Sequence, residues 1–428
     1  MVRRPGARLA YLVSRRKGII IRSREDQPAR DRVGSRLLVI WLAYLGFVSL
    51  GLPDGLHGVA WPYVRATFHL PLDALGTLLV VFTVGYLLSS FSSGRLLARM
   101  SVGTLLAVSC LLMAVALAGY ALTPGWWLMV MVTAIAGAGS GAIDAGLNTY
   151  AATHFSPRTV NWLHACYGVG ASVGPVLMTS VLNAGYVWRW GYGIVAISQV
   201  VMAIAFGLTR RLWDGGSSAR SAAEEAPAAS TRATLRLPVV WLSVATFFVY
   251  TGLESAAGTW AFSLFTEGRG VAMREAGIWV SVYFGCLTAG RVVFGFVAEW
   301  RAARWLLRGC MVAVAVGAAL IWLNMSALSS ALGLALMGFA AGPIFPSLIA
   351  ATPRRVGEAH TANAVGFQIS AAVLGASLLP AAVGIIADRL GPESVGPALL
   401  SLALVLIALY ESLRFAGPKE VREATLPA

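Results

Sequence analysis

Residues 131–154 read MVTAIAGAGSGAIDAGLNTYAATH, an apolar run of membrane-spanning length that is rich in glycine and carries one carboxylate, Asp144. A charged side chain near the bilayer centre costs roughly 2.5 to 3.5 kcal/mol, so it persists where it faces protein or a water-filled cavity. Because Asn148 lies four residues after Asp144, the two side chains share one helix face. The small residues around them predict close packing against neighbouring helices. The alternative is a tight helix crossing that one polar pair holds together.

The composition places the chain among integral membrane proteins. Apolar residues make up 57% of the chain and charged residues 12%, whereas soluble domains are about 25% charged. The apolar residues form long blocks of the roughly 20 residues that a spanning helix needs. We therefore predict an all-α membrane protein with twelve transmembrane helices in two groups of six. The blocks lie near residues 37–64, 74–94, 103–122, 125–154, 160–184, 192–212, 237–265, 276–298, 305–323, 327–351, 361–387 and 395–415.

The basic residues predict the orientation of the chain. Its formal net charge is +14, yet nearly all Arg and Lys fall on one side when the spans are counted from a cytoplasmic N-terminus. This asymmetry predicts an inner (plasma) membrane protein with both termini and the middle linker in the cytoplasm. Contact with anionic lipid is a secondary role, and we expect no nucleic-acid partner. Five of the 33 basic residues lie on the opposite side: Arg65, Arg189, Arg269, Arg274 and Arg389.

The chain divides into five segments. Residues 1–36 form an arginine-rich arm that we expect to be disordered, and residues 416–428 form a cytoplasmic tail. Six-helix bundles are predicted over residues 37–212 and 237–415. Residues 213–236 join them as a cytoplasmic linker, because their polar, low-complexity composition cannot build a core.

An internal repeat relates the two bundles. A shift of 200 residues places Gly85 on Gly285, and a shift of 205 places residues 170–175 (GASVGP) on residues 375–380 (GASLLP). Because six crossings return the chain to the same side, both halves have the same orientation in the membrane. Parallel halves match the fold of major facilitator transporters, in which substrate binds near the bilayer midplane between the halves.

Two further acids lie in predicted spans and join Asp144 as candidate proton-coupling residues. Asp54 follows Pro53 in a glycine-rich stretch, where a proline is expected to break regular helix hydrogen bonding. His57 lies three residues on and is a candidate partner for Asp54. Alternatively, Asp54 lies in water at the outer end of its span. Glu254 belongs to the seventh span.

Polar and aromatic side chains in the spans are candidates for binding a solute. Amides hydrogen-bond hydroxyl groups and aromatic rings stack on a sugar, although an interface belt is the commoner role for any one aromatic residue. A membrane histidine is about as often a hydrogen-bonded packing residue. The predicted substrate-binding residues are Asn148, His164, Tyr167, Trp260, Gln368 and Asn363.

Two basic segments occupy equivalent loops, after the second and the eighth predicted spans. They predict a cytoplasmic gate in which charges pair across helix ends, with simple positive-inside anchoring as the alternative. The second copy carries an acid, and the first has Ala98 in that place. The predicted gating residues are Arg95, Arg99, Arg291 and Glu299.

The fourth span resembles that of the fucose:proton symporter family of the major facilitator superfamily, which includes glucose and galactose carriers. That family has Glu-x-x-x-Asn-Pro there; Asp144 and Asn148 match, and Thr149 replaces the proline. Asp54 sits where the family has an aspartate in its first span, whereas Glu254 replaces a neutral amide. The resemblance implies proton-coupled symport of a monosaccharide by alternating access, with Asp144 as the principal proton carrier and Asp54 as the second acid.

Other functions remain as alternatives. Residues 170–175 resemble part of an antiporter motif, Gly-x-x-x-Gly-Pro, which favours proton-coupled efflux of drugs. A receptor or scaffold derived from a transporter would not need the three acids. The sequence has no nucleophile elbow, phosphate loop or metal cluster, so we predict no enzyme, no cofactor and no metal. A pathway within one chain predicts a monomer whose partners are a small-molecule solute, H⁺ and membrane lipid.

Overall fold

The computed structural model describes residues 27–213, 229–297 and 303–416. Within these ranges the regular secondary structure is helical, and twelve segments are long and apolar enough to cross a membrane. This result confirms the predicted all-α fold with twelve transmembrane helices. Most of the predicted arm, most of the linker, Glu299 and nearly all of the tail lie outside the described residues.

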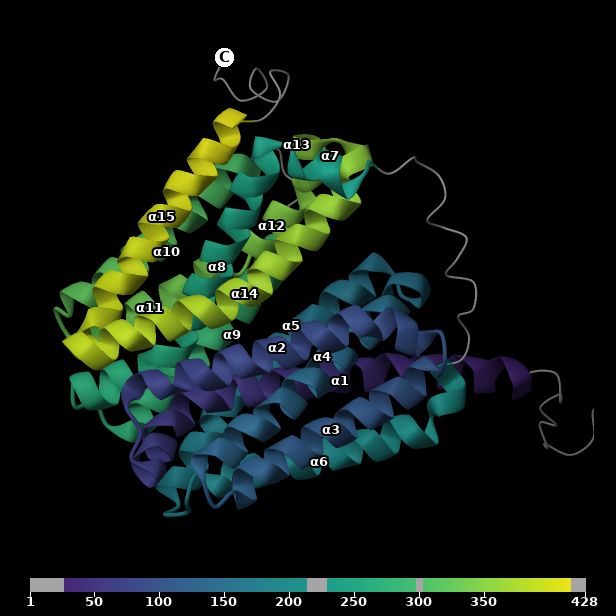
Figure 1. The fold of residues 1–428 in the computed structure, drawn as a ribbon, viewed down its shortest axis with the longest axis horizontal. Coiled ribbons are helices and arrows are strands. Elements are labelled where there is room, and N and C mark those ends of the chain that lie inside the picture. The colour runs from purple at the N-terminus through teal and green to yellow at the C-terminus, as the bar shows by residue number, and fades with distance from the viewer. Residues whose placement is uncertain (1–26, 214–228, 298–302, 417–428) are drawn as a thin grey trace, which may run out of the picture.

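The first six spans form one bundle, which we call the N-half (Figure 1). A short 3₁₀ turn precedes its second helix and another follows its sixth. The elements are α1 (Gln27–Phe68), η1 (Leu72–Ala74), α2 (Leu75–Leu97), α3 (Val102–Leu122), α4 (Trp126–His154), α5 (Pro157–Asn183), α6 (Arg189–Leu208) and η2 (Arg210–Trp213).

The helix α1 continues through Pro53, and the predicted loss of helix hydrogen bonding is the one bond that proline, which has no N–H, cannot donate. A Cβ at Gly51 would lie 2.1 Å from the carbonyl oxygen of Tyr167, so α1 rests directly against α5. A proline is tolerated inside a spanning helix where neighbouring helices pack closely around it. Asp54 consequently lies well inside α1 rather than at its outer end.

The remaining six spans form the C-half. One span consists of two helices that are interrupted at Gly342 and Pro343, and a short helix lies in the segment predicted as a cytoplasmic linker. The elements are α7 (Thr231–Leu235), α8 (Pro238–Ser263), the π turn η3 (Leu264–Gly268), α9 (Met273–Val297), α10 (Ala303–Leu323), α11 (Ala327–Ala341), α12 (Ile344–Ala350), α13 (Thr352–Val356), α14 (Glu358–Leu390), η4 (Pro392–Ser394) and α15 (Val395–Ala416).

The two halves repeat one packing plan. In the N-half α1 packs on α5 and α2 on α4; in the C-half α8 packs on α14 and α9 on α11. A Cβ at Gly170 of α5 would lie 2.0 Å from the carbonyl oxygen of Val48, and a Cβ at Gly375 of α14 would lie 2.0 Å from that of Phe248. The glycines that the 205-residue shift pairs therefore make the same helix contact. The internal repeat in the sequence corresponds to a repeat in the structure.

The halves meet at the end of the bundle that lies opposite the first residues of α1 and the short helix α7 (Figure 1). We call this the far end. Arg65 of α1 forms a 2.8 Å ion pair with Glu267 of η3, and the backbone N–H of Leu72 donates to Asp388 of α14 over 2.7 Å. Toward the end that carries α7, the ribbons of the two halves diverge (Figure 1).

Candidate functional site

The first polar cluster surrounds Asp144 in the N-half. The Tyr86 hydroxyl donates to one carboxylate oxygen of Asp144 over 2.6 Å, and the Asn148 amide donates to the other over 2.9 Å. The same amide also reaches the backbone carbonyl of Asp144 at 3.0 Å. Asp144 and Asn148 therefore share a helix face, as the sequence predicts.

Glycines bring Tyr86 to this acid. A Cβ at Gly141 of α4 would lie 2.4 Å from the carbonyl oxygen of Tyr86, and a Cβ at Gly137 would lie 2.0 Å from that of Phe82. The predicted close packing around the Asp144 face is thus the contact between α4 and α2. Sequence reasoning missed Tyr86, because its position beside Asp144 depends on how these two helices pack.

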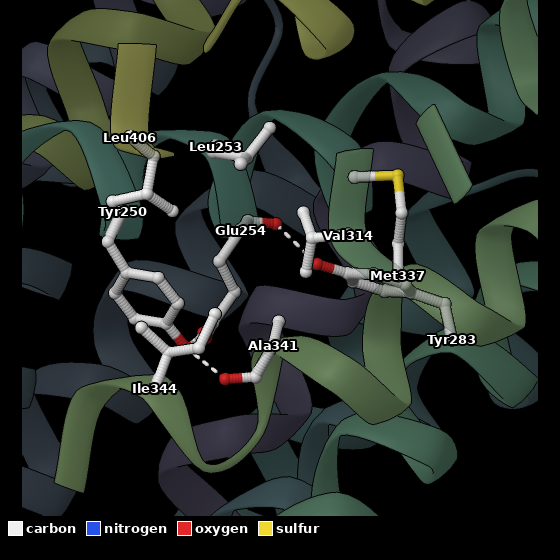
Figure 2. Close-up of a pocket in the computed structure, with 9 residues that line it drawn as sticks. All are labelled: Tyr250, Leu253, Glu254, Tyr283, Val314, Met337, Ala341, Ile344 and Leu406. Carbon is white, nitrogen blue, oxygen red and sulfur yellow. Dashed lines mark hydrogen bonds between the residues drawn. The ribbon is translucent and has the colours of Figure 1, made fainter. Parts of the chain in front are cut away.

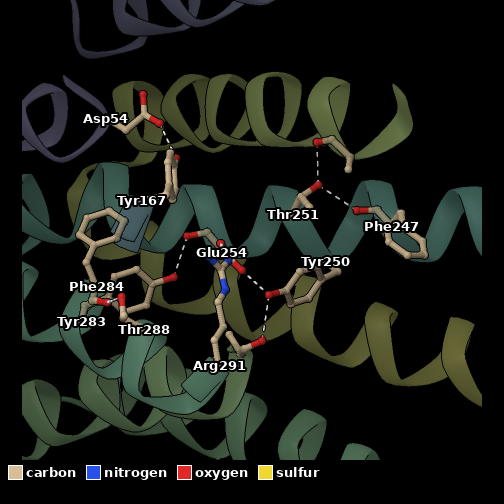
Figure 3. A network of polar contacts seen from close by, with 12 residues as sticks. Asp54, Tyr167, Phe247, Tyr250, Thr251, Glu254, Tyr283, Phe284, Thr288 and Arg291 are labelled. Atoms are coloured by element: carbon tan, nitrogen blue, oxygen red, sulfur yellow. Dashed lines mark hydrogen bonds and ion pairs between the residues drawn. The ribbon is translucent and has the colours of Figure 1, made fainter. Parts of the chain in front are cut away.

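The second acid, Asp54, is exposed and accepts a 2.5 Å hydrogen bond from the Tyr167 hydroxyl of α5 (Figure 3). The predicted partner, His57, points elsewhere: its Nδ1 lies 2.9 Å from the hydroxyl of Tyr192 in α6. The His57 ring instead packs in the N-half interior near the ring of Tyr120. The predicted Asp54–His57 pair is therefore wrong, and Tyr167 takes that place.

The third acid, Glu254, lies in a denser network in the C-half (Figure 3). An Arg291 guanidinium nitrogen is 3.0 Å from its carboxylate, and the Tyr250 hydroxyl hydrogen-bonds the same carboxylate. The Tyr283 hydroxyl donates to the Glu254 backbone carbonyl over 2.7 Å. The Tyr250 hydroxyl also lies 2.8 Å from the carbonyl oxygen of Ala341.

Beside this network is a small cavity of about 10 Å³, which is close to the space that one water molecule needs. Figure 2 shows Glu254 between Tyr250 and Tyr283, with apolar side chains around the rest. The cavity lies within the C-half. Its lining residues are Tyr250, Leu253, Glu254, Tyr283, Val314, Met337, Ala341, Ile344 and Leu406.

Arg291 departs from its predicted position. The sequence places it in a cytoplasmic gating segment, but it belongs to α9 and its side chain turns into the C-half to reach Glu254. An arginine inside a span is stabilised by an acidic partner, and Glu254 supplies one. Arg95 lies in the last turn of α2 and Arg99 follows the helix, both exposed, and their gating role stays a prediction.

The repeat relates two of the three acids. The shift of 200 residues that pairs Gly85 with Gly285 also pairs Asp54 with Glu254, and Gly58 with Gly258. A Cβ at Gly58 would lie 2.9 Å from the carbonyl oxygen of Gly258, so α1 and α8 cross at these glycines. Each acid precedes its glycine by four residues, on the same helix face. Asp54 and Glu254 thus flank the crossing from opposite halves, a relationship that the sequence repeat already contained.

The sequence matches the profile of the Major Facilitator Superfamily over residues 43–380 and again over residues 242–425. The chain belongs to the Major Facilitator Superfamily. A comparison with curated proteins found no match.

Solved structures of other transporters are similar to this superfamily member in fold. For a mutant of the nucleoside transporter NupG, the TM-score is 0.70 at 15% identity, with 88% of this chain and 99% of that chain covered. For an inward-facing, unoccupied bacterial homologue of the human lysosomal transporter Spinster, the TM-score is 0.67 at 15% identity, with 92% of this chain and 97% of that chain covered. For the peptide transporter POT in complex with sulfate, the TM-score is 0.66 at 12% identity, with 89% of this chain and 95% of that chain covered.

In this facilitator superfamily member, three predicted substrate-binding residues lie around the acids. Asn148 holds Asp144 and Tyr167 holds Asp54. His164 of α5 is exposed and packs edge-on against Phe47, with ring centroids 5.3 Å apart. His164 lies on α5 in the neighbourhood of Asp144 of its own half and of Arg291 of the other half.

The other three predicted substrate-binding residues satisfy contacts elsewhere. Gln368 is buried and donates to Ser243 over 2.6 Å. Trp260 is buried and donates to the carbonyl of Pro380 over 2.8 Å. Asn363 donates to the Ala229 carbonyl over 2.8 Å, where the chain enters the C-half. These polar groups stabilise helix and linker packing, so the structure does not place them at the site that the acids form.

Proposed function

We propose that the protein is a secondary active transporter that couples inward proton movement to symport of a small polar solute, a neutral monosaccharide, by alternating access. The main support for this proposal is that two acids, Asp54 and Asp144, lie inside spans and are hydrogen-bonded by uncharged side chains. The neutral partners leave each carboxyl group free to gain and lose a proton. The protein is expected to act as a monomer in the inner (plasma) membrane.

The two acids have different roles in this proposal. Asp144 is the principal proton carrier, and Tyr86 and Asn148 hold its two oxygens in place. Asp54 is exposed and accepts a hydrogen bond from Tyr167 at one oxygen, so it links protonation to the solute by accepting a second hydrogen bond from a solute hydroxyl. A hydroxyl-rich solute supplies such donors, and hydrogen bonds to an ionised carboxylate are shorter and stronger than those between neutral groups.

The arrangement of the halves supports alternating access around this site. The far end is closed by contacts between the halves, including Arg65–Glu267. With the termini in the cytoplasm, as the basic residues predict, the structure corresponds to an inward-facing state. In the outward-facing state the far-end contacts break, and Arg95 and Arg99 are proposed to help close the cytoplasmic end.

Glu254 is not assigned to proton transfer in this proposal, although the sequence suggested it. Its carboxylate is paired with Arg291, and a guanidinium does not lose its proton in proteins. The pair therefore belongs to the wall of the solute site. Drug efflux is the second candidate, but its supporting motif, residues 170–175, is explained by the helix contact at Gly170, which the C-half repeats at Gly375.

The test is proton movement into liposomes that contain the purified protein, after addition of neutral monosaccharides or of cationic drugs. We expect sugar-induced acidification for the wild type and none for Asp144→Asn. Glu275→Gln, which removes an exposed acid at the start of α9, is the matched control and is expected to behave as the wild type. Acidification driven only by drugs, or equal sugar responses in all three proteins, would contradict the proposal.

A further inference from the structure

The charge of the solute site is distributed unequally between the halves. On the N-half side, Asp54 and Asp144 are hydrogen-bonded by Tyr167, Tyr86 and Asn148, none of which carries a charge. On the C-half side, Glu254 is paired with Arg291 at 3.0 Å. The C-half wall therefore adds an acid and a base together, with no net charge.

The charges of Glu254 and Arg291 can act on a solute bound at the crossing of the halves. The side chains of Arg291 and Glu254 are 23% and 19% exposed, so neither is sealed in the C-half core. Tyr167, which holds Asp54 from the N-half, precedes Gly168, where a Cβ would lie 2.0 Å from the hydroxyl of Thr288 on α9, the helix that carries Arg291. Figure 3 shows Asp54 and Tyr167 on one side of this network and Arg291 on the other.

Removing one member of such a pair leaves a full charge without its partner. An unpaired charge inside a protein is strongly unfavourable and attracts any mobile ion of opposite sign. If Arg291 were neutral, Glu254 would join Asp54 and Asp144 as a third acid with neutral partners, and the added negative charge beside the α1–α8 crossing would favour an organic cation. Arg291 removes this possibility while leaving Asp54 unchanged.

We infer that the Glu254–Arg291 pair is a charge filter that makes the site select a neutral solute over a cationic one. Arg291 is the specificity-determining residue, since it pairs with Glu254 at 3.0 Å and cancels its charge. This inference deepens the proposed function and rests on it for the location of the solute. The ligand class it names is the uncharged polar solute, with lipophilic and amine cations excluded.

The experiment measures equilibrium binding of the cation tetraphenylphosphonium to purified protein, so it requires no sugar and no proton flux. Arg291→Gln is expected to bind this cation about tenfold or more tightly than the wild type, because one uncompensated charge a few ångström away contributes at least that much. The double variant Glu254→Gln, Arg291→Gln is expected to return to wild-type binding, because the wall is neutral again.

Controls separate a charge effect from general damage. Arg308→Gln breaks another arginine–glutamate pair, Arg308–Glu411 at 2.6 Å between α10 and α15, and is expected to leave cation binding unchanged. Arg291→Lys retains the charge and is expected to bind as the wild type does. Cation binding by a folded Arg291→Gln at the wild-type level, or equal gains in the single and double variants, would overturn the filter.

A second variant covers the case in which Arg291→Gln does not fold. Glu254→Gln leaves the guanidinium unpaired and is expected to bind an anionic sugar acid, glucuronate, about tenfold or more tightly than the wild type does. No gain for glucuronate in this folded variant would overturn the filter. A wild type that binds no sugar would refute the monosaccharide assignment alone, because the cation and anion measurements do not depend on it.

Discussion

The two halves have the same helix packing but differ in the chemistry of their central acids. Asp54 and Glu254 occupy repeat-equivalent positions beside the α1–α8 crossing. Asp54 accepts from the neutral Tyr167, whereas Glu254 is paired with Arg291. Equivalent backbones thus place an acid at the same point, and one side chain from a neighbouring helix decides whether that acid is neutralised.

A second pair of repeat-equivalent positions, Asp144 and Phe345, has an acid in the N-half and an aromatic residue in the C-half. A shift of 201 residues pairs Gly141 with Gly342, and a Cβ at either would lie close to a carbonyl oxygen of the neighbouring helix, at 2.4 Å and 2.5 Å respectively. The same shift pairs Asp144 with Phe345, which packs edge-on against Phe247 at 5.2 Å. Proton chemistry is therefore proposed for the N-half alone, while the C-half builds a neutral wall.

The largest expected effect tests this division at the equivalent acids. Asp54→Asn is expected to reduce sugar-driven proton uptake in liposomes to the level of empty vesicles, because the link between protonation and the solute is lost. The double variant Glu254→Gln, Arg291→Gln is expected to retain proton uptake, because its wall stays neutral. Loss of uptake in both variants to the same extent would show that the halves share the proton chemistry.

An intermediate effect tests the common packing. Gly170→Ala and Gly375→Ala each place a Cβ 2.0 Å from a backbone carbonyl, so each is expected to destabilise the protein by about 1–3 kcal/mol through overpacking. Thermal unfolding in detergent measures the change, and similar decreases are expected for the two. Gly366→Ala is the control, since no heavy atom lies within 4 Å of its Cβ position. A loss confined to one half would contradict equivalent packing.

The smallest expected effect concerns the boundary between the halves. Arg65 and Glu267 are 30% and 25% exposed, and such an ion pair contributes at most about 1 kcal/mol. Arg65→Gln is expected to raise the outward-facing fraction modestly, as measured by the distance between spin labels on His69→Cys and Ala272→Cys. Glu393→Gln breaks a far-end pair with Arg269 inside the C-half and should leave that distance unchanged. An equal change of the spin-label distance in Arg65→Gln and Glu393→Gln would contradict a specific role for the ion pair between the halves.

The sequence by itself determined the number of spans, the division into two repeated halves and the positions of the acids along the spans. Hydropathy, glycine spacing and repeat offsets are local properties of the chain, so they can be interpreted without knowing which helices touch. The pairing of Asp144 with Asn148 belongs to this class, because four residues along one helix fix their relative direction.

Only the tertiary structure decided which groups meet across helices. Tyr167 lies 113 residues from Asp54 and replaces the nearby His57 as its partner. Arg291 lies 37 residues from Glu254 and leaves the predicted gate to neutralise it. Gln368 donates a hydrogen bond to Ser243 and so lies away from the proposed solute site. Each outcome depends on the rotation and depth of one helix against another, and close packing between helices sets both.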